Sequence, residues 1–198
     1  MSAPEVAVFL EAPRLGAVKP RLARDVGDRH ALRLYRVMAA RTLEVVDRAG
    51  LEATVWYAPA DAAPEMRFWL GERRRLVPQA SGDQGARLAA SLRAAAPGRA
   101  WLALTADCPG LDAGLLLAAA AHVLHGDPVV GPTDDGGYYL IGGVAPLPDL
   151  FSDIPWGSGR VLSETRLRLA RAGRVWRELP TLRAVSTAAD AHAEGLLT

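Results

Sequence analysis

The chain has little of three things that decide where a protein works and what it binds: cysteine, lysine and long apolar runs. Cys108 is the only cysteine among 198 residues, which excludes an internal disulfide, and the four histidines form no zinc-type cluster with it. No apolar run approaches the roughly 20 residues that span a bilayer, and the first ten residues lack a signal-peptide pattern. We expect a cytoplasmic protein with no membrane partner.

Charge of one sign is not in excess either. The net charge is +1 and charged residues make up 23% of the chain, without the strong basic bias that is typical of nucleic-acid binding. We therefore expect no nucleic-acid partner; the oligomeric state stays open. Because two halves of a 198-residue chain would each be small and marginal, we expect one domain over residues 1–198.

Lysine is the rarest charged residue. Lys19 is the only lysine among 23 basic residues, and all the others are arginine. A chain so biased toward arginine keeps one lysine either by chance or because a compact, strongly hydrated ammonium is needed where a planar guanidinium does not serve. The position of Lys19 therefore matters for the function.

What the chain does contain is a regular alternation of short apolar runs and amphipathic segments, which predicts a three-layer α/β/α, Rossmann-like domain with a mainly parallel mixed sheet. A glycine- and proline-bearing loop, residues 12–22, follows the first run, and another loop contains Pro146 and Pro148. We expect strands at 5–10, 53–57, 76–77, 101–105, 128–131, 138–141 and 175–176. We expect helices at 31–46, 62–70, from Asp83 to Pro97, from Asp112 to Gly126, from Ser158 to about 171, and at 188–197.

Polar side chains follow three of these strands. Lys19 and Arg21 come after the first strand, Asp107 after the fourth, and Asp134 with Asp135 after the fifth. Ligands of open α/β sheets bind at the carboxyl ends of the strands. A lysine and an arginine can hold phosphate oxygens, and Mg²⁺ is held in proteins by one or two carboxylates plus phosphate oxygens. The three segments together predict a nucleotide site.

Each segment also has a structural interpretation. Lys19 and Arg21 are then surface charges, Asp107 organises a turn through its own side chain, and residues 134–137 form a tight hairpin turn. Their joint occurrence at three strand ends favours the functional interpretation.

Several motifs together carry a family resemblance. They are A-P-x-x-G-x-V-K-x-R-L (12–22), G-D-x-G-x-R-L (82–88), D-C-P-G-L (107–111), G-P-x-D-D-G-G-Y-Y-L-I-G (131–142), I-P-W (154–156) and V-L-x-E-T (161–165). This set resembles a bacterial family often labelled glycosyltransferase, which is associated with radical-SAM proteins and belongs to the GT-A, or nucleotide-diphospho-sugar transferase, superfamily. The resemblance covers almost the whole chain.

The resemblance implies a GT-A domain in which Asp107 holds Mg²⁺ or Mn²⁺ and in which the first loop holds the phosphates. Asp135 and Asp190 are the candidate second metal ligands. The nucleotide-binding residues that it implies are Ala12, Pro13, Gly16, Lys19, Arg21, Gly82, Asp83 and Arg87. Those on the acceptor or sugar side are Asp134, Asp135, Gly136, Gly137, Tyr138 and Trp156.

The K-x-R-L piece is also similar to the first loop of 2-phospholactate guanylyltransferase, where a basic pair stabilises charge on the departing pyrophosphate. We therefore predict a magnesium-dependent enzyme that transfers a nucleotidyl group from a nucleoside triphosphate to a small phosphorylated or acidic acceptor, with Lys19, Arg21 and Asp107 as catalytic residues. The alternative is glycosyl transfer from a nucleotide-diphospho-sugar.

The chain departs from the family pattern at several positions. Pro20 stands where relatives usually have threonine, and Ala106 stands where they often have threonine or serine. The family's D-V-D-T corresponds here to residues 184–187, A-V-S-T. If one of those aspartates is a metal ligand in relatives, Ala184 and Ser186 remove it. A non-catalytic nucleotide-binding protein with a degenerate metal site is therefore a third hypothesis.

Overall fold

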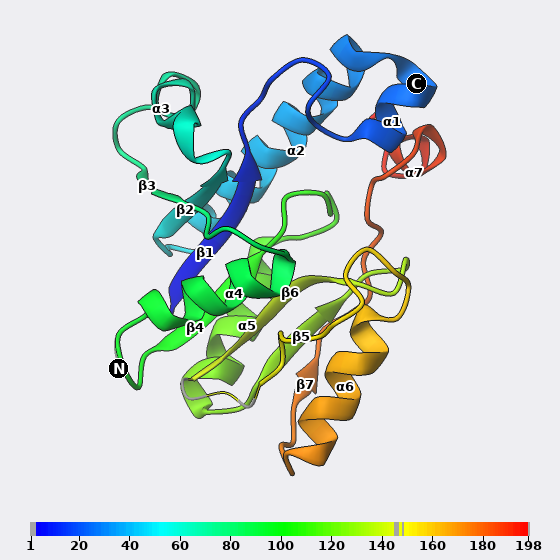
Figure 1. Cartoon of the computed structure of the whole chain (residues 1–198). Helices are drawn as coiled ribbons and strands as arrows, with labels where there is room; N and C mark the ends of the chain where they lie inside the picture. The colour runs from blue at the N-terminus through cyan, green and yellow to red at the C-terminus, as the bar shows by residue number, and fades with distance from the viewer. Residues whose placement is uncertain (1–2, 145–146, 148, 198) are drawn as a thin grey trace.

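The computed structural model describes residues 3–144, 147 and 149–197, so the predicted loop of Pro146 and Pro148 lies outside the described residues. Strands and helices alternate along the chain (Figure 1). The strands are β1 (Glu5–Glu11), β2 (Ala53–Ala58), β3 (Arg75–Pro78), β4 (Ala100–Leu104), β5 (Val129–Pro132), β6 (Tyr138–Val144) and β7 (Arg177–Glu178). The helices are α1 (Pro20–Val26), α2 (Asp28–Arg48), the 3-10 turn η1 (Ala60–Ala62), α3 (Ala63–Leu70), α4 (Gln84–Ala94), α5 (Ala113–His125), α6 (Val161–Arg171) and α7 (Ala188–Ala193).

The strands form one sheet in the order β3-β2-β1-β4-β6-β5-β7. β6 pairs antiparallel with both β4 and β5, and the other neighbours pair in parallel. This confirms the predicted α/β fold with a mainly parallel mixed sheet. Because β1, β4 and β5 therefore run in the same direction, the chain segments that follow them leave the sheet at the same edge.

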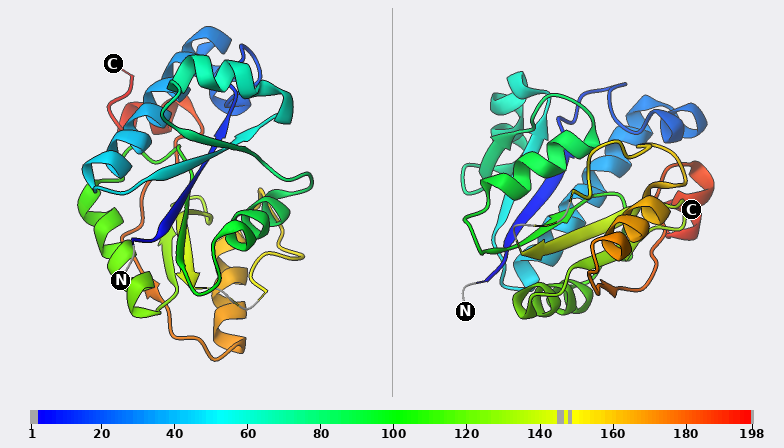
Figure 2. Two further views of the ribbon diagram at one scale, coloured as in Figure 1. Left: turned by 90° about the vertical axis from the view of Figure 1, so that its left-hand side faces the viewer. Right: turned by 60° about the horizontal axis from the view of Figure 1, so that its bottom comes forward.

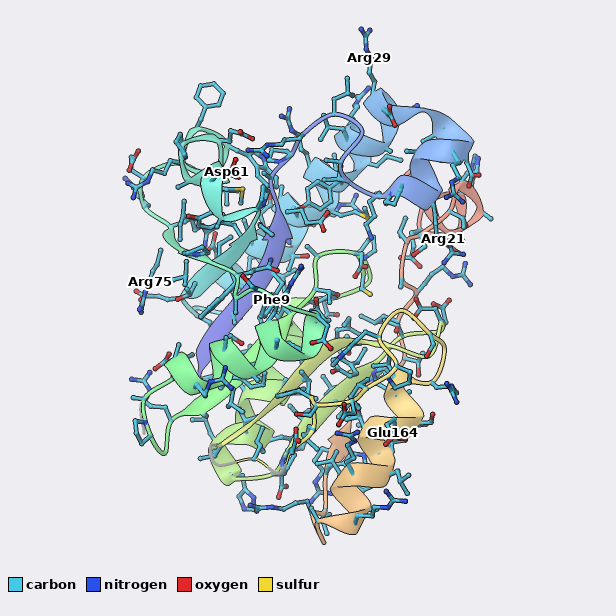
Figure 3. The ribbon with its side chains drawn as sticks, viewed as in Figure 1. Phe9, Arg21, Arg29, Asp61, Arg75 and Glu164 are labelled. Atoms are coloured by element: carbon cyan, nitrogen blue, oxygen red, sulfur yellow. The ribbon has the colours of Figure 1, made fainter. Side chains whose placement is uncertain are left out.

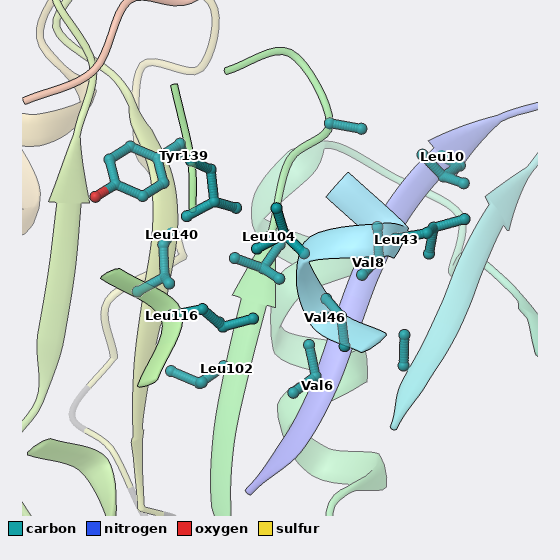
Figure 4. Packing of buried hydrophobic residues seen from close by; sticks show 14 of the residues in the cluster. Val6, Val8, Leu10, Leu43, Val46, Leu102, Leu104, Leu116, Tyr139 and Leu140 are labelled. Atoms are coloured by element: carbon teal, nitrogen blue, oxygen red, sulfur yellow. The ribbon is translucent and has the colours of Figure 1, made fainter. Parts of the chain in front are cut away.

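Helices cover both faces of the sheet, with α2 and α5 on one face and α4 and α6 on the other (Figure 2). The alternation of side chains along β1 sends Val6, Val8 and Leu10 into the α2/α5 layer and Ala7 into the α4 layer. Figure 4 shows the first of these layers, in which Leu43 of α2 packs against β1. These two apolar layers hold the strands in place, and so they also fix the positions of the strand ends.

A third, smaller apolar cluster joins the start of the chain to its end. Leu22 of α1 packs with α2 residues and with Val185 and Ala191 from the last segment. The Asp25 carboxylate also accepts a hydrogen bond from the backbone N–H of Ala188, at 2.9 Å. This cluster brings the loop after β1 against residues 184–188, which are more than 160 positions away in the sequence.

Four sequence predictions about elements are corrected. The predicted loop 12–22 ends in α1, which begins at Pro20, because proline's fixed φ suits the first helical position. Ser158 does not cap α6, since its hydroxyl donates to Pro155 O instead. The last strand lies at β7, two residues after the predicted 175–176, and α7 ends at Ala193, before the predicted 197. No helix within the described ranges is long and apolar enough to cross a membrane.

Candidate nucleotide site

A pocket of about 310 Å³ opens at the carboxyl edge of the sheet, between the ends of β1 and β4 and the helices α1, α2 and α4. Its volume lies in the range of small-molecule sites. Its walls come from six segments of the chain: Phe9, Leu10, Glu11, Lys19, Pro20, Tyr35, Gln79, Gln84, Arg87, Thr105, Ala106 and Asp107. Three of the predicted site residues, Lys19, Arg87 and Asp107, thus lie around one pocket.

The Lys19 ammonium lies in this pocket against the carboxylate of Asp107. Nζ donates to Asp107 Oδ2 at 3.0 Å and to the backbone oxygen of Val185 at 3.0 Å. The backbone N–H of Val185 donates in turn to Asp107 O at 2.9 Å. The loop after β1, the end of β4 and the segment before α7 therefore meet at a single ion pair.

Backbone conformation and packing hold Lys19 in place. Lys19 caps α1 in the left-handed region, with φ 49° and ψ 57°, a conformation that non-glycine residues rarely adopt. Pro20 fixes the next residue and Leu22 is fully buried in the third apolar cluster, so the backbone on both sides is constrained. The Lys19 side chain is only 16% exposed. The only lysine of the chain is therefore directed into the pocket by the fold.

Asp107 is kept ionised by its neighbours. Burial by itself raises the pKa of this carboxyl, but the Lys19 ammonium and the Thr105 hydroxyl outweigh burial and hold the pKa below its usual value. Thr105 Oγ1 donates to Asp107 Oδ1 at 2.6 Å, so each carboxylate oxygen has a donor. The Asp107 side chain is 30% exposed, so the ion pair remains accessible from the pocket.

A second polar set lines the same pocket. The side-chain amide of Gln79, at the end of β3, donates to Leu10 O and Trp56 O, and so ties the ends of β1 and β2 together. Its oxygen accepts a hydrogen bond from Arg87 Nη1 at 3.1 Å. Arg87 Nε is buried with no hydrogen-bond partner among the described residues. Buried N–H donors normally have an acceptor, so this unpaired donor is an exception among the described residues.

The two aspartates after β5 form hydrogen bonds with nearby loop residues and do not line the pocket. Asp134 pairs with Arg183 Nε at 3.2 Å and accepts from Ala184 N at 3.1 Å. Asp135 accepts from Thr133 Oγ1 at 2.6 Å and from Gly137 N at 3.2 Å. Asp134 thus holds the segment that reaches the Lys19–Asp107 pair, and Asp135 closes the turn.

The glycines and aromatic residues of the predicted acceptor side also have packing partners. Gly136 has φ +85°, and a Cβ there would lie 2.2 Å from Gly159 O. Tyr138 packs edge-on against Trp156, with ring centroids 6.3 Å apart, and the indole N–H of Trp156 is buried near Gly85 of α4. The structure therefore explains these residues through packing, and their role toward an acceptor stays a prediction.

Several predicted nucleotide-binding residues lie off the pocket wall. Arg21 is exposed on α1, away from Phe9, which lies toward the middle of the molecule (Figure 3). Gly16 is exposed in the first loop, Gly82 precedes α4 with φ +108°, and Asp83 caps that helix by accepting from Ala86 N. Ala12 is buried and Pro13 half-buried in the loop. Their predicted contacts with a nucleotide are not tested by this arrangement.

Thr105, Gln79 and Tyr35 are among the pocket residues that the sequence did not predict. Thr105 lies two positions before Asp107, and Gln79 directly follows β3, so both are polar residues at strand ends that the same rule predicts. Tyr35 lies on the predicted apolar face of α2, yet its hydroxyl donates to Glu11 O and accepts from Glu11 N. Nothing in the periodicity distinguishes it from an ordinary core residue.

The donor set does not suit a resident divalent cation. The described residues contain no group of three or more histidine, cysteine, aspartate or glutamate side chains placed to hold a metal ion. Of the two acidic residues on the pocket wall, Glu11 and Asp107, the strand-end Asp107 is already paired with Lys19. Val185, within residues 184–187, lies against Asp107, and its neighbours there carry a methyl group at Ala184 and a hydroxyl at Ser186.

Solved structures similar to this chain are transferases or share their fold. A candidate nucleotide-diphospho-sugar transferase from Desulfovibrio desulfuricans G20 has 29% identity and a TM-score of 0.87, over 94% of this chain and 84% of that chain. A Methanothermobacter nucleotidyl transferase has 19% identity and a TM-score of 0.58, covering 96% and 95%. A manganese complex of a Mycobacterium tuberculosis H37Rv protein has 18% identity and a TM-score of 0.58, covering 96% and 97%. The last two likenesses show the fold alone.

The family assignment comes from a family model. No protein with a curated description matches the chain. The expected links to radical-SAM proteins and to 2-phospholactate guanylyltransferase stay predictions. The model that matches, over residues 41–158, contains the end of β4 with Asp107 and the Asp-Asp-Gly-Gly turn. The chain therefore belongs to the family described as "Uncharacterized protein conserved in bacteria (DUF2064)".

Proposed function

We propose that this protein binds a nucleoside triphosphate in the pocket and transfers its nucleotidyl group to a small phosphorylated or acidic acceptor. The observation that carries the proposal is the placement of the only lysine, whose ammonium lines a pocket at the carboxyl edge of an α/β sheet. Arg87, with a buried N–H that has no partner among the described residues, lines the same pocket. Cations and free donors at this edge are what a phosphorylated ligand requires.

In the proposed reaction an oxygen of the acceptor attacks the α-phosphorus of the triphosphate. A bond forms between that oxygen and the α-phosphorus, the bond to the bridging oxygen breaks, and pyrophosphate leaves with the electron pair. An acceptor phosphate or carboxylate attacks as an anion, so no side chain has to remove a proton. The Lys19 ammonium stabilises the charge that gathers on the departing pyrophosphate.

Arg87 serves the remainder of the nucleotide in this proposal. Gln79 holds one terminal nitrogen of its guanidinium, so the planar group cannot turn freely. The guanidinium, which lines the pocket, then offers its N–H groups to an acceptor atom of the nucleotide. Exchange of Arg87 for leucine should lower affinity for the preferred triphosphate more than for the others, if that acceptor belongs to the base.

Arg21 and magnesium have weaker support than Lys19. Arg21 is exposed on α1 and does not line the pocket, so the proposed reaction does not use it. Magnesium at the predicted ligand Asp107 would have to share its carboxylate with Lys19. The proposal therefore assigns charge neutralisation to Lys19 and gives no step to a metal ion.

Glycosyl transfer is the second candidate, because one structure at 29% identity and a TM-score of 0.87 is described as a candidate nucleotide-diphospho-sugar transferase. The pocket and its polar residues serve a nucleotide sugar in the same way, but the bond that breaks lies between the sugar and the diphosphate. The two candidates therefore differ in which nucleotide binds and which product is released.

The test is a screen of ATP, GTP, CTP and UTP, and of the corresponding nucleotide sugars, by thermal shift and by pyrophosphate release with phosphorylated and carboxylate acceptors. We expect one triphosphate to raise the melting temperature and to yield pyrophosphate. Stabilisation by nucleotide sugars alone would favour the second candidate. Binding without turnover over a broad acceptor set would favour the non-catalytic hypothesis.

Matched variants sharpen this screen. Lys19→Ala should weaken triphosphate binding at least tenfold, because a charged hydrogen bond of about 1.5–3 kcal/mol is lost. Arg14→Ala is the control: Arg14 lies in the same loop, is paired with Glu65 at 2.7 Å and does not line the pocket. Equal losses in the two variants would remove the special role of Lys19.

A further inference from the structure

The Lys19 ammonium has one more donor than its partners in the protein use. An ammonium carries three N–H groups. Asp107 Oδ2 and Val185 O take one each, both at 3.0 Å. The third N–H has no acceptor among the described residues, and the side chain lines the pocket. An ammonium bound to a carboxylate on one side and open on the other can bridge that carboxylate to a phosphate oxygen.

This bridging arrangement resembles that of a divalent cation in a nucleotide site. Such a cation links one or two protein carboxylates to the phosphate oxygens of the ligand. Here the two oxygens of Asp107 already have donors, Thr105 Oγ1 at 2.6 Å and Lys19 Nζ at 3.0 Å. A cation that bound the same carboxylate would have to displace one of these donors and would be repelled by the ammonium.

Lys19 cannot move away from Asp107 without disturbing its surroundings. Its backbone is held in the left-handed region between a loop and the proline that starts α1. Val185, whose carbonyl is its second acceptor, is fully buried and donates its own N–H to Asp107 O. The ammonium is thus preorganised where the phosphates would bind, so little rearrangement is needed on binding.

Neighbouring carboxylates do not complete a metal site. Asp190 Oδ2 accepts from the N–H groups of Ser186 and Thr187 and from the Thr187 hydroxyl, in the capping box of α7. Asp135 closes its own turn. The residues on either side of Val185 are Ala184 and Ser186, neither of which carries a charge. The acidic residues of the pocket wall are Asp107, which Lys19 pairs, and Glu11.

We propose that the Lys19 ammonium takes the place of a divalent cation in this pocket, so that nucleotide phosphates bind there without Mg²⁺ or Mn²⁺. The inference rests on the proposed function, since it concerns how the same nucleotide is held. It differs from the sequence prediction of magnesium dependence because the carboxylate assigned to the metal is occupied by the lysine. It also identifies the positions beside Val185 as those where a carboxylate would restore a metal site.

The first test is calorimetric titration of the purified protein with ATP, GTP, CTP and UTP, once in EDTA and once in excess MgCl₂. We expect the dissociation constant of the preferred triphosphate to agree within twofold between the two conditions, and Lys19→Ala to raise it at least tenfold in EDTA. Binding that is tenfold or more tighter with Mg²⁺ overturns the inference and leaves the proposed function standing. No binding of any triphosphate in either condition overturns both.

The second test installs the carboxylate. Ser186→Asp adds a negative charge beside Val185, so it should weaken binding in EDTA at least tenfold while excess MgCl₂ restores it. Ser163→Asp, at an exposed position on α6, is the control for added charge and should leave binding unchanged in both conditions. Circular dichroism and melting curves verify that both variants fold. An S186D protein that binds equally with and without Mg²⁺ contradicts the assignment of these positions.

Discussion

Two aspartate segments leave the same edge of the sheet, after β4 and after β5. The sequence predicts a site role for both, with Asp107 as the metal ligand and Asp134 and Asp135 on the acceptor side. Asp107 has a lysine ammonium and a threonine hydroxyl as its side-chain donors, and its side chain lines a pocket. Asp134 and Asp135 are bonded to the backbone and side chains of residues that close a turn or anchor the segment before α7. One segment faces the pocket, and the other holds the fold around it.

The comparison teaches that strand-end position by itself does not make a carboxylate a ligand group. The hydrogen-bond and charge partners of the carboxylate decide whether it stabilises a turn or can act on a ligand. A carboxylate whose oxygens accept from nearby backbone N–H groups stabilises a turn, as an Asx turn does. A carboxylate that is paired with a cation at a pocket wall has an electrostatic role that a ligand can share. The predictions below test this division from the largest expected effect to the smallest.

Gly136→Ala should destabilise the protein most. The residue has φ +85°, and the new Cβ would lie 2.2 Å from Gly159 O, a backbone atom that cannot turn aside. We expect a loss of about 3 kcal/mol, which corresponds to roughly 6–12 °C in melting temperature for a chain of this size. Thermal unfolding followed by circular dichroism measures it.

Gly157→Ala is the matched control for that substitution. Gly157 also has a positive φ, +75°, but a Cβ there would meet nothing within 4 Å. The variant should lose only the stability that the positive φ costs an alanine, about 1 kcal/mol. Equal losses at the two glycines would show that the turn is not packed against the start of α6 as described.

Asp134→Ala should lower stability by about 1.5 kcal/mol, because the Ala184 N–H loses its acceptor and Arg183 loses its partner. If Asp134 acts only through the fold, the triphosphate that the pocket prefers should bind within twofold of its wild-type affinity at a temperature where the variant is folded. Chemical denaturation and calorimetric titration give the two numbers. A tenfold loss of affinity with unchanged stability would make Asp134 a ligand group and break the comparison.

Asp107→Asn should show its effect on stability only above acid pH. A carboxyl whose pKa is lowered in the folded state contributes stability above its unfolded pKa of about 3.9, and loses it as the pH falls through the folded value. We expect wild type to exceed the variant by about 1 kcal/mol at pH 6, and this difference to shrink as the pH falls through the folded pKa of Asp107. Urea denaturation across this range measures the difference; a constant difference at all pH values would mean that the Lys19–Asp107 charge pair is not its cause.

Arg21→Ala should have the smallest effect. Arg21 is exposed, and its side chain does not line the pocket, although it stands only two residues from Lys19. We expect triphosphate affinity to change less than twofold, in calorimetric titrations run beside Lys19→Ala. A loss as large as that of Lys19→Ala would restore the basic pair that the sequence predicts.

Most of the fold followed from local patterns. The apolar runs predicted all seven strands to within a few residues, and Asp83 and Asp112 cap α4 and α5 as predicted, because a cap bond joins residues only three apart. Two exceptions lie at helix starts. Pro20 starts a helix where a loop was predicted, and Ser158 bonds to Pro155 instead of capping α6. Either outcome suits these residues, so the surrounding structure decides between them.

The sequence by itself determined the layer architecture and the carboxyl edge of the sheet where polar residues collect. It also predicted Lys19 and Asp107 as residues of the site. Only the tertiary structure decided that the Lys19 ammonium binds both the Asp107 carboxylate and the backbone oxygen of Val185. It also decided that Gln79 and Arg87 line the same pocket as this pair. These contacts join residues 8 to 166 positions apart. Periodicity and turn chemistry act over a few residues, whereas such pairings depend on how the layers pack.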